Sequence, residues 1–489
     1  MVCMVLGIAG ADMQPSIYWY DFETTGTNPA RDRAIQFAGV RTDLDLEVVE
    51  APLTLLCYPG DDTLPDPEAM MVTGISMSML QTQGLTETEF IGRIHEAFAR
   101  PATCVAGFNS IRFDDEFTRY TLYRNFIDPY GREWQNDNSR WDVIDLFRMA
   151  HALRPEGMVW PENEDGSPVF RLEELTRANG IDHAWAHDAA SDVAATVDLA
   201  RKQKAAQPRL YDYLFNLRRK QDVIKQLYPL GKTAMVHVSS MYPAARNCLA
   251  VVLPLCTHPT NANGVICYDL SFDPDELIAA GPDELHRRLF TAREDLAEDE
   301  ERIHLKTIHV NRCPAIAPLA AMRPEDTERL GIELSACEEN MKRLRGAAGI
   351  VEKIQDAFGQ TTFAQTDDPD LMLYQGEFFS SSDRGKLLAL RGLSPEELRD
   401  SGGGFDDARI DEMLFRYRAR NYPSSLTAGE RERWNRFRVE KWQSQGEPKA
   451  TLAKIDELLR RGESTECLLD LKRYIEGLGR DAMPNQAIL

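Results

Sequence analysis

The sequence predicts an α/β layer domain, then a β-rich region, and then helices to the end of the chain. Strand-like and helix-like segments alternate from residue 17 to about residue 208, which is typical of an α/β layer. Between residues 231 and 318 short strand-like runs are separated by turn residues, a pattern that indicates a small barrel or barrel-like sheet. From residue 323 onward the pattern is helical.

In the first region, β-branched and aromatic residues from position 17 predict a strand that ends in two acids and a Thr-Thr-Gly turn. Short links to the next two strands suggest a meander. Apolar residues on one side of 88–99 predict an amphipathic helix. The first expected strand begins at residue 17, and the next three span 34–40, 53–58 and 103–108. The expected helices span 88–99, 114–124, 142–153, 171–178 and 188–203.

Beyond this region, a helix is expected over 210–227, and the turn residues at 261–264 separate two strands. The expected strands are 234–238, 248–253, 264–268 and 303–310, with a helical insertion near 282–296. Later helices are expected to start at Pro324, Ser382, Ser394, Asp406 and Thr427, with a flexible joint at 401–404.

Bulk composition narrows the class of protein. A chain of 489 residues is too long for one core, so several domains are expected. Nine scattered cysteines without a Cys-x-x-Cys pair indicate reduced thiols rather than disulfides or zinc. The net charge of −22 argues against a generally basic nucleic-acid coat but leaves room for a local basic groove.

The apolar start of the chain lacks a basic n-region and is too short to span a bilayer. We therefore expect no membrane segment and a cytoplasmic protein. Residues 1–15 are a leader that we expect to be poorly ordered, and Met13 is an alternative start.

Asp21 and Glu23 are the most informative pair of residues. Side chains alternate along a strand, so these two carboxylates share a face while Phe22 points into the opposite layer. Two carboxylates at the end of a buried strand repel each other, and a divalent cation between them relieves the repulsion. Alone, the Asp-x-Glu pattern is also common without a metal.

Two further acids, Asp114 and Asp192, also lie near the end of an expected strand or the start of an expected helix. Asp114 comes after the strand that ends near Phe108, although it or Asp115 could simply cap the next helix. If Asp188 caps the helix after it, Asp192 lies one turn inside that helix and His187 stays in the preceding loop. The alternative for the last two is an exposed histidine and an acid on a polar helix face.

Together the pieces favour a metal site. Asp21, Glu23, Asp114 and Asp192 carry a formal charge of −4, which matches two divalent cations. Two such ions about 4 Å apart clamp the attacking and leaving oxygens of a phosphoryl displacement. Oxygen ligands suit Mg²⁺, with Mn²⁺ as a substitute, and argue against zinc. A neutral histidine such as His187 accepts a proton from water at neutral pH.

Asp-x-Glu, Asn-x-x-x-Phe-Asp and His-x-x-x-x-Asp occur in that order and resemble the DEDDh class of 3′→5′ exonucleases in the ribonuclease-H-like superfamily. The match extends over nearly the whole chain and is similar to the bacterial exonuclease I family, which degrades single-stranded DNA. The segments that carry it are 21–24, 109–116, 137–142, 153–157 and 417–421.

The resemblance implies a ribonuclease-H-like exonuclease domain over 16–207, an SH3-like barrel domain over 208–358 and an α-helical domain over 359–489. It also implies Mg²⁺-dependent release of 5′-mononucleotides from a 3′ end, and a role in DNA repair and recombination. Carried onto this chain, Asp21, Glu23 and Asp192 hold the first metal, with Asp21 bridging to the second. Asp114 acts near the second metal, and His187 is the general base.

Single strands are held by basic side chains on phosphates and by aromatic faces under bases. Arg140 is the preferred phosphate contact, with Arg112 and Arg171 as further candidates and Trp141 as an aromatic one. Each has a structural alternative, and for Trp141 that alternative is the core.

The resemblance further implies binding of the acidic C-terminal tail of single-stranded DNA-binding protein. Such a tail needs a basic pocket with an apolar floor. Arg154, Tyr213 and Arg323 match that pocket, with help from Arg345. Arg323 is otherwise an ordinary residue at a helix start.

Two other functions stay open. The first is a DEDDh exoribonuclease, although those enzymes are usually little more than the first 200 residues of this chain. The second is a non-catalytic nucleic-acid-binding scaffold, which the presence of all five catalytic residue types disfavours. A self-contained groove needs no partner subunit, so we expect a monomer.

Overall fold

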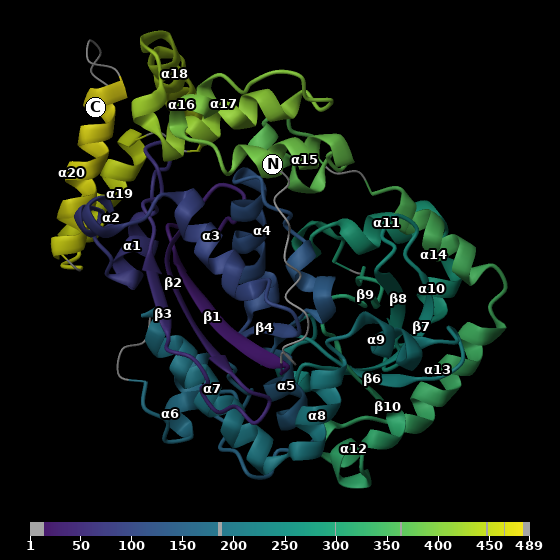
Figure 1. Ribbon diagram of the computed structural model, residues 1–489. Helices are drawn as coiled ribbons and strands as arrows, with labels where there is room; N and C mark the ends of the chain where they lie inside the picture. The colour runs from purple at the N-terminus through teal and green to yellow at the C-terminus, as the bar shows by residue number, and fades with distance from the viewer. Residues whose placement is uncertain are drawn as a thin grey trace. The chain divides into compact units, whose positions relative to one another are not determined.

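The computed structural model describes residues 14–183, 188–298, 300–361, 364–445, 448–463 and 465–482 (Figure 1). The chain packs into two compact units. Unit 1 is drawn from residues 1–139, 184–194 and 365–489, and unit 2 from residues 140–183 and 195–364. Segments from the two ends of the chain therefore share one unit.

Unit 1 is built on a mixed sheet in the order β3-β2-β1-β4-β5. The central strand β1 pairs antiparallel with β2 and parallel with β4, and β2 pairs antiparallel with β3. This confirms the predicted meander of the first three strands. The strands are β1 (Ser16–Thr24), β2 (Ala34–Thr42), β3 (Leu53–Leu56), β4 (Thr103–Gly107) and β5 (Ser139–Asp142). Of β5, Ser139 belongs to unit 1 and the other three residues belong to unit 2.

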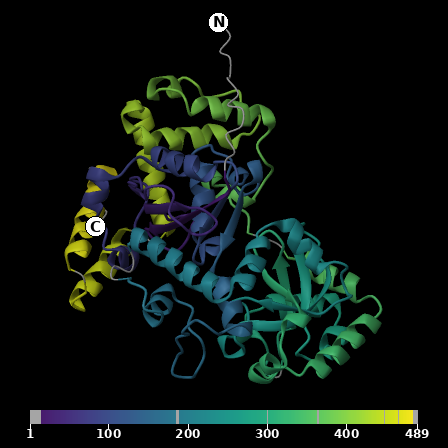
Figure 2. The same ribbon diagram turned by 60° about the horizontal axis from the view of Figure 1, so that its bottom comes forward.

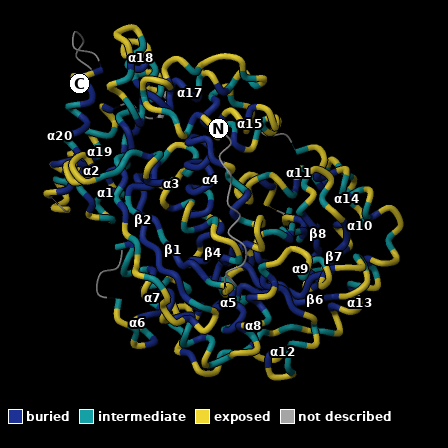
Figure 3. Tube along the Cα trace, in the orientation of Figure 1, coloured by how far each residue is buried: buried dark blue, intermediate teal, exposed yellow. Residues whose placement is uncertain are grey.

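Two helices, α3 (Glu87–Phe98) and α4 (Asp114–Arg124), cover one face of this sheet. Their apolar side chains pack against alternate residues of β1, among them Tyr20 and Phe22, in one buried cluster. Figure 3 shows β1, β2 and β4 as buried. The prediction that Phe22 lies in the core is confirmed, and Asp21 and Glu23 consequently belong to the other face.

Two short helices after β3 were not predicted. Asp66 and Ser76 cap α1 (Pro67–Thr73) and α2 (Met77–Gln83). They pack in one buried cluster with helices from the other end of the chain, namely α18 (Ala428–Gln445), α19 (Pro448–Arg460) and α20 (Thr465–Ala482). That cluster contains Met70, Met77, Leu80, Trp442, Ile455, Leu468, Leu471 and Ile475.

The remaining helices of unit 1 are η1 (Ser110–Arg112), η2 (Gly131–Glu133), η3 (Gln135–Asp137), η7 (Pro369–Tyr374), α15 (Ser381–Leu390), α16 (Pro395–Arg399), α17 (Arg409–Asn421) and η8 (Pro423–Ser425). The expected starts of α15, α16 and α18 lie within one residue of the observed starts. For α17 the prediction was three residues early.

A buried ion cluster joins α17 to the rest of unit 1. Arg420 Nη2 donates to Asp370 Oδ2 over 2.5 Å, and its Nε donates to Asp62 Oδ2 over 3.1 Å. Arg416 Nη1 lies 3.1 Å from the same Asp370 oxygen. Asp62 follows β3, and Arg420 lies in the last turn of α17. The cluster therefore links the N-terminal and C-terminal segments of unit 1.

Unit 2 contains a five-stranded antiparallel sheet in the order β10-β6-β7-β8-β9 (Figure 2). Its strands are β6 (Met235–Val238), β7 (Leu249–Thr257), β8 (Gly264–Asp269), β9 (Leu305–His309) and β10 (Ala315–Pro318). The four predicted strands are confirmed, and β10 was missed because it is short and ends in proline. Proline is tolerated there because β10 is an edge strand.

The rest of unit 2 is largely helical. The segment 210–227, predicted as one helix, forms two, because Arg219 has extended backbone angles (φ −92°, ψ 117°). The helices are α5 (Ile144–Leu153), α6 (Leu172–Ala178), α8 (Pro208–Asn216), α9 (Lys220–Leu227), α10 (Asp275–Ala279), α11 (Pro282–Phe290), α12 (Pro324–Leu330), α13 (Leu334–Gly346) and α14 (Ile350–Gly359), together with η4 (Ala244–Arg246), η5 (Arg293–Asp295) and η6 (Leu319–Ala321). Helix α7 (Ala189–Ala206) begins in unit 1 and continues in unit 2.

Candidate metal centre

Strand β1 places Asp21 and Glu23 on one face at its carboxyl end. The parallel pairing with β4 ends at Trp19, so both acids lie beyond the last residue that β4 pairs. On the antiparallel side, Glu23 lies opposite Gln36 of β2. The acids therefore stand at the open end of the sheet, where α/β folds place functional groups.

Helix α7 supplies a third acid through a capped first turn. Ser191 N donates to Asp188 Oδ2 over 3.3 Å, and Asp192 N donates to the Asp188 carbonyl over 3.0 Å. Asp188 thus caps the helix, as predicted, and Asp192 lies one turn inside it.

Gln36 connects this helix start to the sheet. Its Nε2 donates to Asp188 Oδ1 over 3.2 Å, and its Oε1 accepts from Ala189 N over 3.3 Å. Both hydrogen bonds tie the first turn of α7 to β2 beside Glu23. Sequence reasoning missed Gln36, and its one signal was an amide within the otherwise apolar run 34–40.

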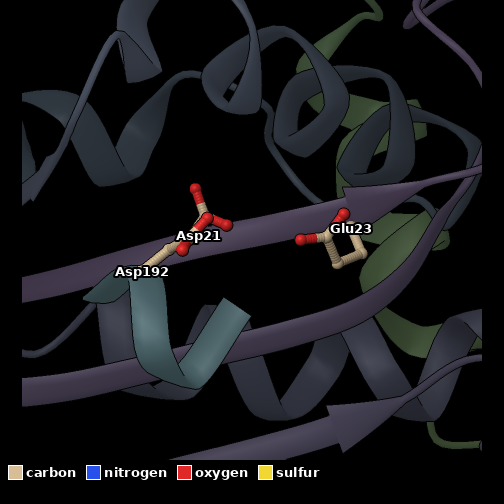
Figure 4. A group of neighbouring side chains, drawn as sticks. All are labelled: Asp21, Glu23 and Asp192. Atoms are coloured by element: carbon tan, nitrogen blue, oxygen red, sulfur yellow. The ribbon is translucent and has the colours of Figure 1, made fainter. Parts of the chain in front are cut away.

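Asp21, Glu23 and Asp192 meet in space (Figure 4). One carboxylate oxygen from each lies within 4.8 Å of the other two. Among the residues that the structure describes, no other group of three histidines, cysteines or acids comes together in this way. Figure 4 shows Asp192 reaching Asp21 from α7, while Glu23 extends from the same strand as Asp21.

The cluster is electrostatically strained. Burial, followed by the charges of Asp114, Asp192 and Asp188, raises the pKa of Asp21 well above its usual range. Burial and the neighbouring charges, chiefly that of Asp21, raise the pKa of Glu23 to about 9. A divalent cation reverses this penalty because it favours the charged form of every ligand. The donor set, entirely carboxylate oxygen, fits a hard ion such as Mg²⁺.

The adjacent acids Asp114 and Asp115 have different roles. Asp114 is 3% exposed, and its Oδ1 accepts from the backbone N of Phe22, between the two acids of β1, over 3.2 Å. Asp115 instead accepts from Tyr20 Oη over 2.8 Å and lies 2.6 Å from Arg132 Nη2. Asp114 is therefore next to the metal-site acids, although it is outside the group of three.

His187 lies outside the described residues, so its predicted position has no structural counterpart here. Its neighbour Asp188 is described and caps α7.

The predicted DNA contacts fall into two groups. Arg112 is exposed, and the Arg171 side chain is 73% exposed and 3.7 Å from Glu174. Arg140 is buried and donates to the Asn311 carbonyl over 3.0 Å.

Trp141 needs a correction. It is 2% exposed, and its ring packs edge-to-face against Tyr211 and Phe215, with centroids 5.1 Å away in both cases. A ring enclosed in this way has no face for a base, so we assign Trp141 to the core rather than to DNA binding.

Two of the predicted partner-binding residues meet in unit 2. Arg154 Nη1 lies 3.3 Å from Asp326 Oδ2, and Arg323 Nε donates to the same oxygen over 3.1 Å. Arg323 Nη2 also contacts Glu156 over 3.1 Å. The two guanidinium groups therefore share one buried acid.

The other two contact backbone carbonyls. Tyr213 Oη donates to the Ile316 carbonyl of β10 over 3.0 Å. Arg345 Nε donates to the Gly231 carbonyl over 2.9 Å.

Among the described residues, every helix is too short or too polar to span a lipid bilayer.

Three family models match consecutive parts of the chain. Residues 18–200 match the model described as Exonuclease, residues 218–360 match the Exonuclease I SH3-like domain, and residues 367–478 match the Exonuclease I C-terminal domain.

Known proteins resemble the chain over most of its length. The Exodeoxyribonuclease I of Haemophilus influenzae is 45% identical over 428 residues, which is 87% of this chain and 90% of that protein. A moderately thermophilic Exonuclease I from Methylocaldum szegediense superposes with a TM-score of 0.90 at 48% identity, over 95% of this chain and 99% of that one. The zinc-bound form of an E. coli exonuclease I complex with single-stranded DNA superposes with a TM-score of 0.90 at 41% identity, over 95% of this chain and 100% of that one.

Proposed function

The chain belongs to the exonuclease I family and is an exodeoxyribonuclease, and we propose that it degrades single-stranded DNA in the 3′→5′ direction and releases 5′-mononucleotides. One structural observation carries the proposal: the carboxylates of Asp21, Glu23 and Asp192, far apart in sequence, gather at the end of β1. The E. coli relative was solved with single-stranded DNA, which supports the choice of substrate.

An exonuclease domain of this kind implies a divalent metal, and we propose two Mg²⁺ ions, with Mn²⁺ as a substitute. Asp21, Glu23 and Asp192 would hold the first, Asp21 would bridge to the second, and Asp114 would act beside the second. When bound, the ions supply positive charge that stabilises the phosphate oxygens during displacement.

The chain's own groups orient and deprotonate the reactants. His187 precedes the helix cap Asp188, and in the proposal its neutral imidazole takes a proton from the attacking water. Exposed Arg112 and Arg171, and the buried Arg140, are the proposed phosphate contacts. Family membership also supports the division into domains over 16–207, 208–358 and 359–489, a monomeric enzyme, and a role in DNA repair and recombination.

We extend the proposal to a partner. Arg154 and Arg323, together with Tyr213 and Arg345, would bind the acidic C-terminal tail of single-stranded DNA-binding protein. The support is the pair of guanidinium groups around Asp326, which presents two cations side by side. Replacement Arg323→Glu should weaken binding of a fluorescent tail peptide in anisotropy, and normal binding by that variant would count against the site.

The test of the activity uses 5′-labelled single-stranded DNA, duplex DNA and a matched RNA oligomer, each with Mg²⁺ or with EDTA. Single-stranded DNA should shorten from its 3′ end with Mg²⁺, and the duplex, the RNA and the EDTA samples should persist. The variant Asp21→Ala should bind the strand without cutting it, because it lacks the bridging ligand. Equal cleavage by wild type and variant would refute the proposed mechanism, and faster decay of RNA would indicate an exoribonuclease.

A further inference from the structure

Unit 1 contains a cavity of about 740 Å³, and none of the metal-site acids lines it. It is lined by the end of α3, by residues 126–138 in part, and by residues of 372–391. Asn136, one of its lining residues, accepts through its carbonyl from Ala102 N over 2.9 Å, and Ser16 N donates to the Ala102 carbonyl over 3.1 Å. The cavity therefore adjoins the start of β1, whereas Asp21 and Glu23 stand at the other end.

The cavity offers aromatic faces on an apolar floor. Phe126, Leu373 and Leu387 are buried beneath it. Phe378 is 79% exposed at its edge, and its ring centroid is 6.0 Å from that of Tyr130, at an interplanar angle of 88°. An aromatic side chain exposed to this extent beside a cavity is suited to stack on a flat ring.

Cationic side chains border the same cavity. Arg384 lies in α15 and Arg391 is the residue that follows the end of this helix, seven positions later, which is about two helical turns. Both line the cavity. Arg384 donates to Ser381 Oγ over 3.2 Å, and the Arg391 guanidinium has no ion pair or hydrogen bond with any residue that the structure describes. The lining acids are Asp128 and Glu377.

The lining charged groups differ in the partners that they already have. The Asp128 carboxylate is engaged by the backbone N of Tyr130, over 2.9 Å, and by that of Gly131, over 3.1 Å. Arg132 and Arg409, the other lining cations, are already paired with Asp115 and Asp407 outside the cavity. Arg391 is therefore the cation most available to an anionic ligand.

His95 also lines the cavity and brings a polar atom to it. Its Nδ1 is buried and has no hydrogen-bond partner among the described residues. Burial, together with the charges of Arg391 and Arg132, lowers the pKa of His95 to about 4. The imidazole is thus neutral at physiological pH, and its buried Nδ1 can still exchange a hydrogen bond with a polar group of a ligand.

We propose that this cavity binds a nucleotide, with its base on the exposed ring of Phe378, beside Tyr130, and its phosphate on Arg391 and Arg384. The volume lies within the roughly 300–1,000 Å³ typical of small-molecule sites. The choice of a nucleotide over other aromatic anions rests on the proposed function. A released mononucleotide and one unit of a DNA strand share this chemistry.

The experiment measures binding to the full-length protein by calorimetry in EDTA, so that no strand is cut. The probes are dAMP, deoxyadenosine and a single-stranded hexamer of deoxyadenylate. Arg391→Ala and Phe378→Ala should each weaken binding of dAMP or of the hexamer at least tenfold. Lys386→Ala is the matched control, because this α15 residue contacts the Gly404 carbonyl rather than the cavity, and it should bind as wild type does. Wild type should bind deoxyadenosine, which lacks the phosphate, more weakly than dAMP, whereas Arg391→Ala should bind the two with similar affinity.

The two ligand arms separate the sources. Weaker dAMP binding in the variants identifies a mononucleotide site, and weaker hexamer binding alone identifies a strand contact. Unchanged affinity for both ligands in Arg391→Ala and Phe378→Ala, with melting temperatures that show intact folds, would overturn the inference. Digestion of single-stranded DNA with Mg²⁺ is followed in parallel, so that failure of this inference is distinguishable from failure of the proposed function.

Discussion

At the scale of single residues, the charged forms of the buried Asp21 and Glu23 carboxyls are unfavourable to the fold. The folded protein raises the pKa of Glu23 from 4.5 to about 9 through burial and the charges of Asp21, Asp192 and Asp188. Between these two values the folded chain holds a proton that the unfolded chain has released. Stability without metal therefore falls as the pH rises through this window.

This predicts a pH-dependent response to metal. In EDTA the melting temperature should fall from pH 6 to pH 9, and Mn²⁺ should raise it most at the alkaline end, where the carboxylates no longer need to lose protons to bind. Differential scanning fluorimetry across this range checks both trends.

The matched control is Glu23→Gln, which keeps the shape of the side chain and cannot titrate. Its melting temperature in EDTA should depend less on pH than that of wild type. Identical pH profiles for the two proteins would mean that Glu23 ionises normally.

Residue-scale contacts also distinguish groups that the sequence leaves equivalent. Asp114 and Asp115 are adjacent acids at a helix start, and local patterns cannot say which of them lies beside the acids of β1. The structure separates them, because Arg132 and Tyr20 engage Asp115 while Asp114 meets the backbone of β1. Trp141 is similar, since an aromatic residue beside an arginine reads equally well as core or as a base contact.

At the scale of elements, the first turn of α7 is held by a side chain from β2. Gln36 makes one hydrogen bond to the Asp188 carboxylate and another to the Ala189 backbone. Both bonds orient the turn that carries Asp192. Groups that orient metal ligands typically change metal affinity by about 10–100-fold when they are removed.

We therefore expect Gln36→Ala to weaken Mn²⁺ binding about tenfold, at the low end of that range, because the turn can then shift. Calorimetric titration of the protein with Mn²⁺ measures this without any turnover. At saturating metal the cleavage rate should recover much of its wild-type value. Gln83→Ala, on the exposed side of α2, is the control, and equal Mn²⁺ affinities in all three proteins would show that Gln36 has no such role.

Elements also show where local patterns suffice. The alternation along β1 and the amphipathic period of α3 depend on neighbours in sequence, and both were predicted. Helices α1 and α2 have seven residues each, too few to show a period, and they owe their place to caps and to distant helices. Gln36 was missed because its role, too, depends on residues that are distant in sequence. Its partners lie about 150 residues away along the chain and come within hydrogen-bonding distance only in the fold.

At the scale of the molecule, a buried ion cluster joins segments from both ends of the chain in unit 1. Asp370 is surrounded by Arg416 and Arg420, and Arg420 also meets Asp62. Although burial alone raises it, the charges of Arg420 and Arg416 hold the pKa of Asp370 well below its usual value. The stabilisation is present above the unfolded pKa of the carboxyl and is lost as the pH falls below it.

Replacement Asp370→Asn should destabilise the protein by about 3–5 kcal/mol, the usual effect of removing one partner from a buried ion pair. Urea unfolding at pH 7 followed by circular dichroism measures this, and the difference from wild type should shrink in acid. Asp400→Asn is the control, because the Asp400 side chain is 73% exposed beside Arg399. A midpoint for Asp370→Asn equal to that of the control would mean that the cluster contributes little.

The cluster in which α1 and α2 pack against α18, α19 and α20 also bears on biosynthesis. During translation, the apolar surfaces of Met70, Met77 and Leu80 leave the ribosome long before their partners around Trp442 and Leu468 are made. A nascent chain that terminates early keeps these surfaces uncovered and is a target for chaperones and proteases. Completion of this apolar cluster is thereby coupled to completion of the polypeptide.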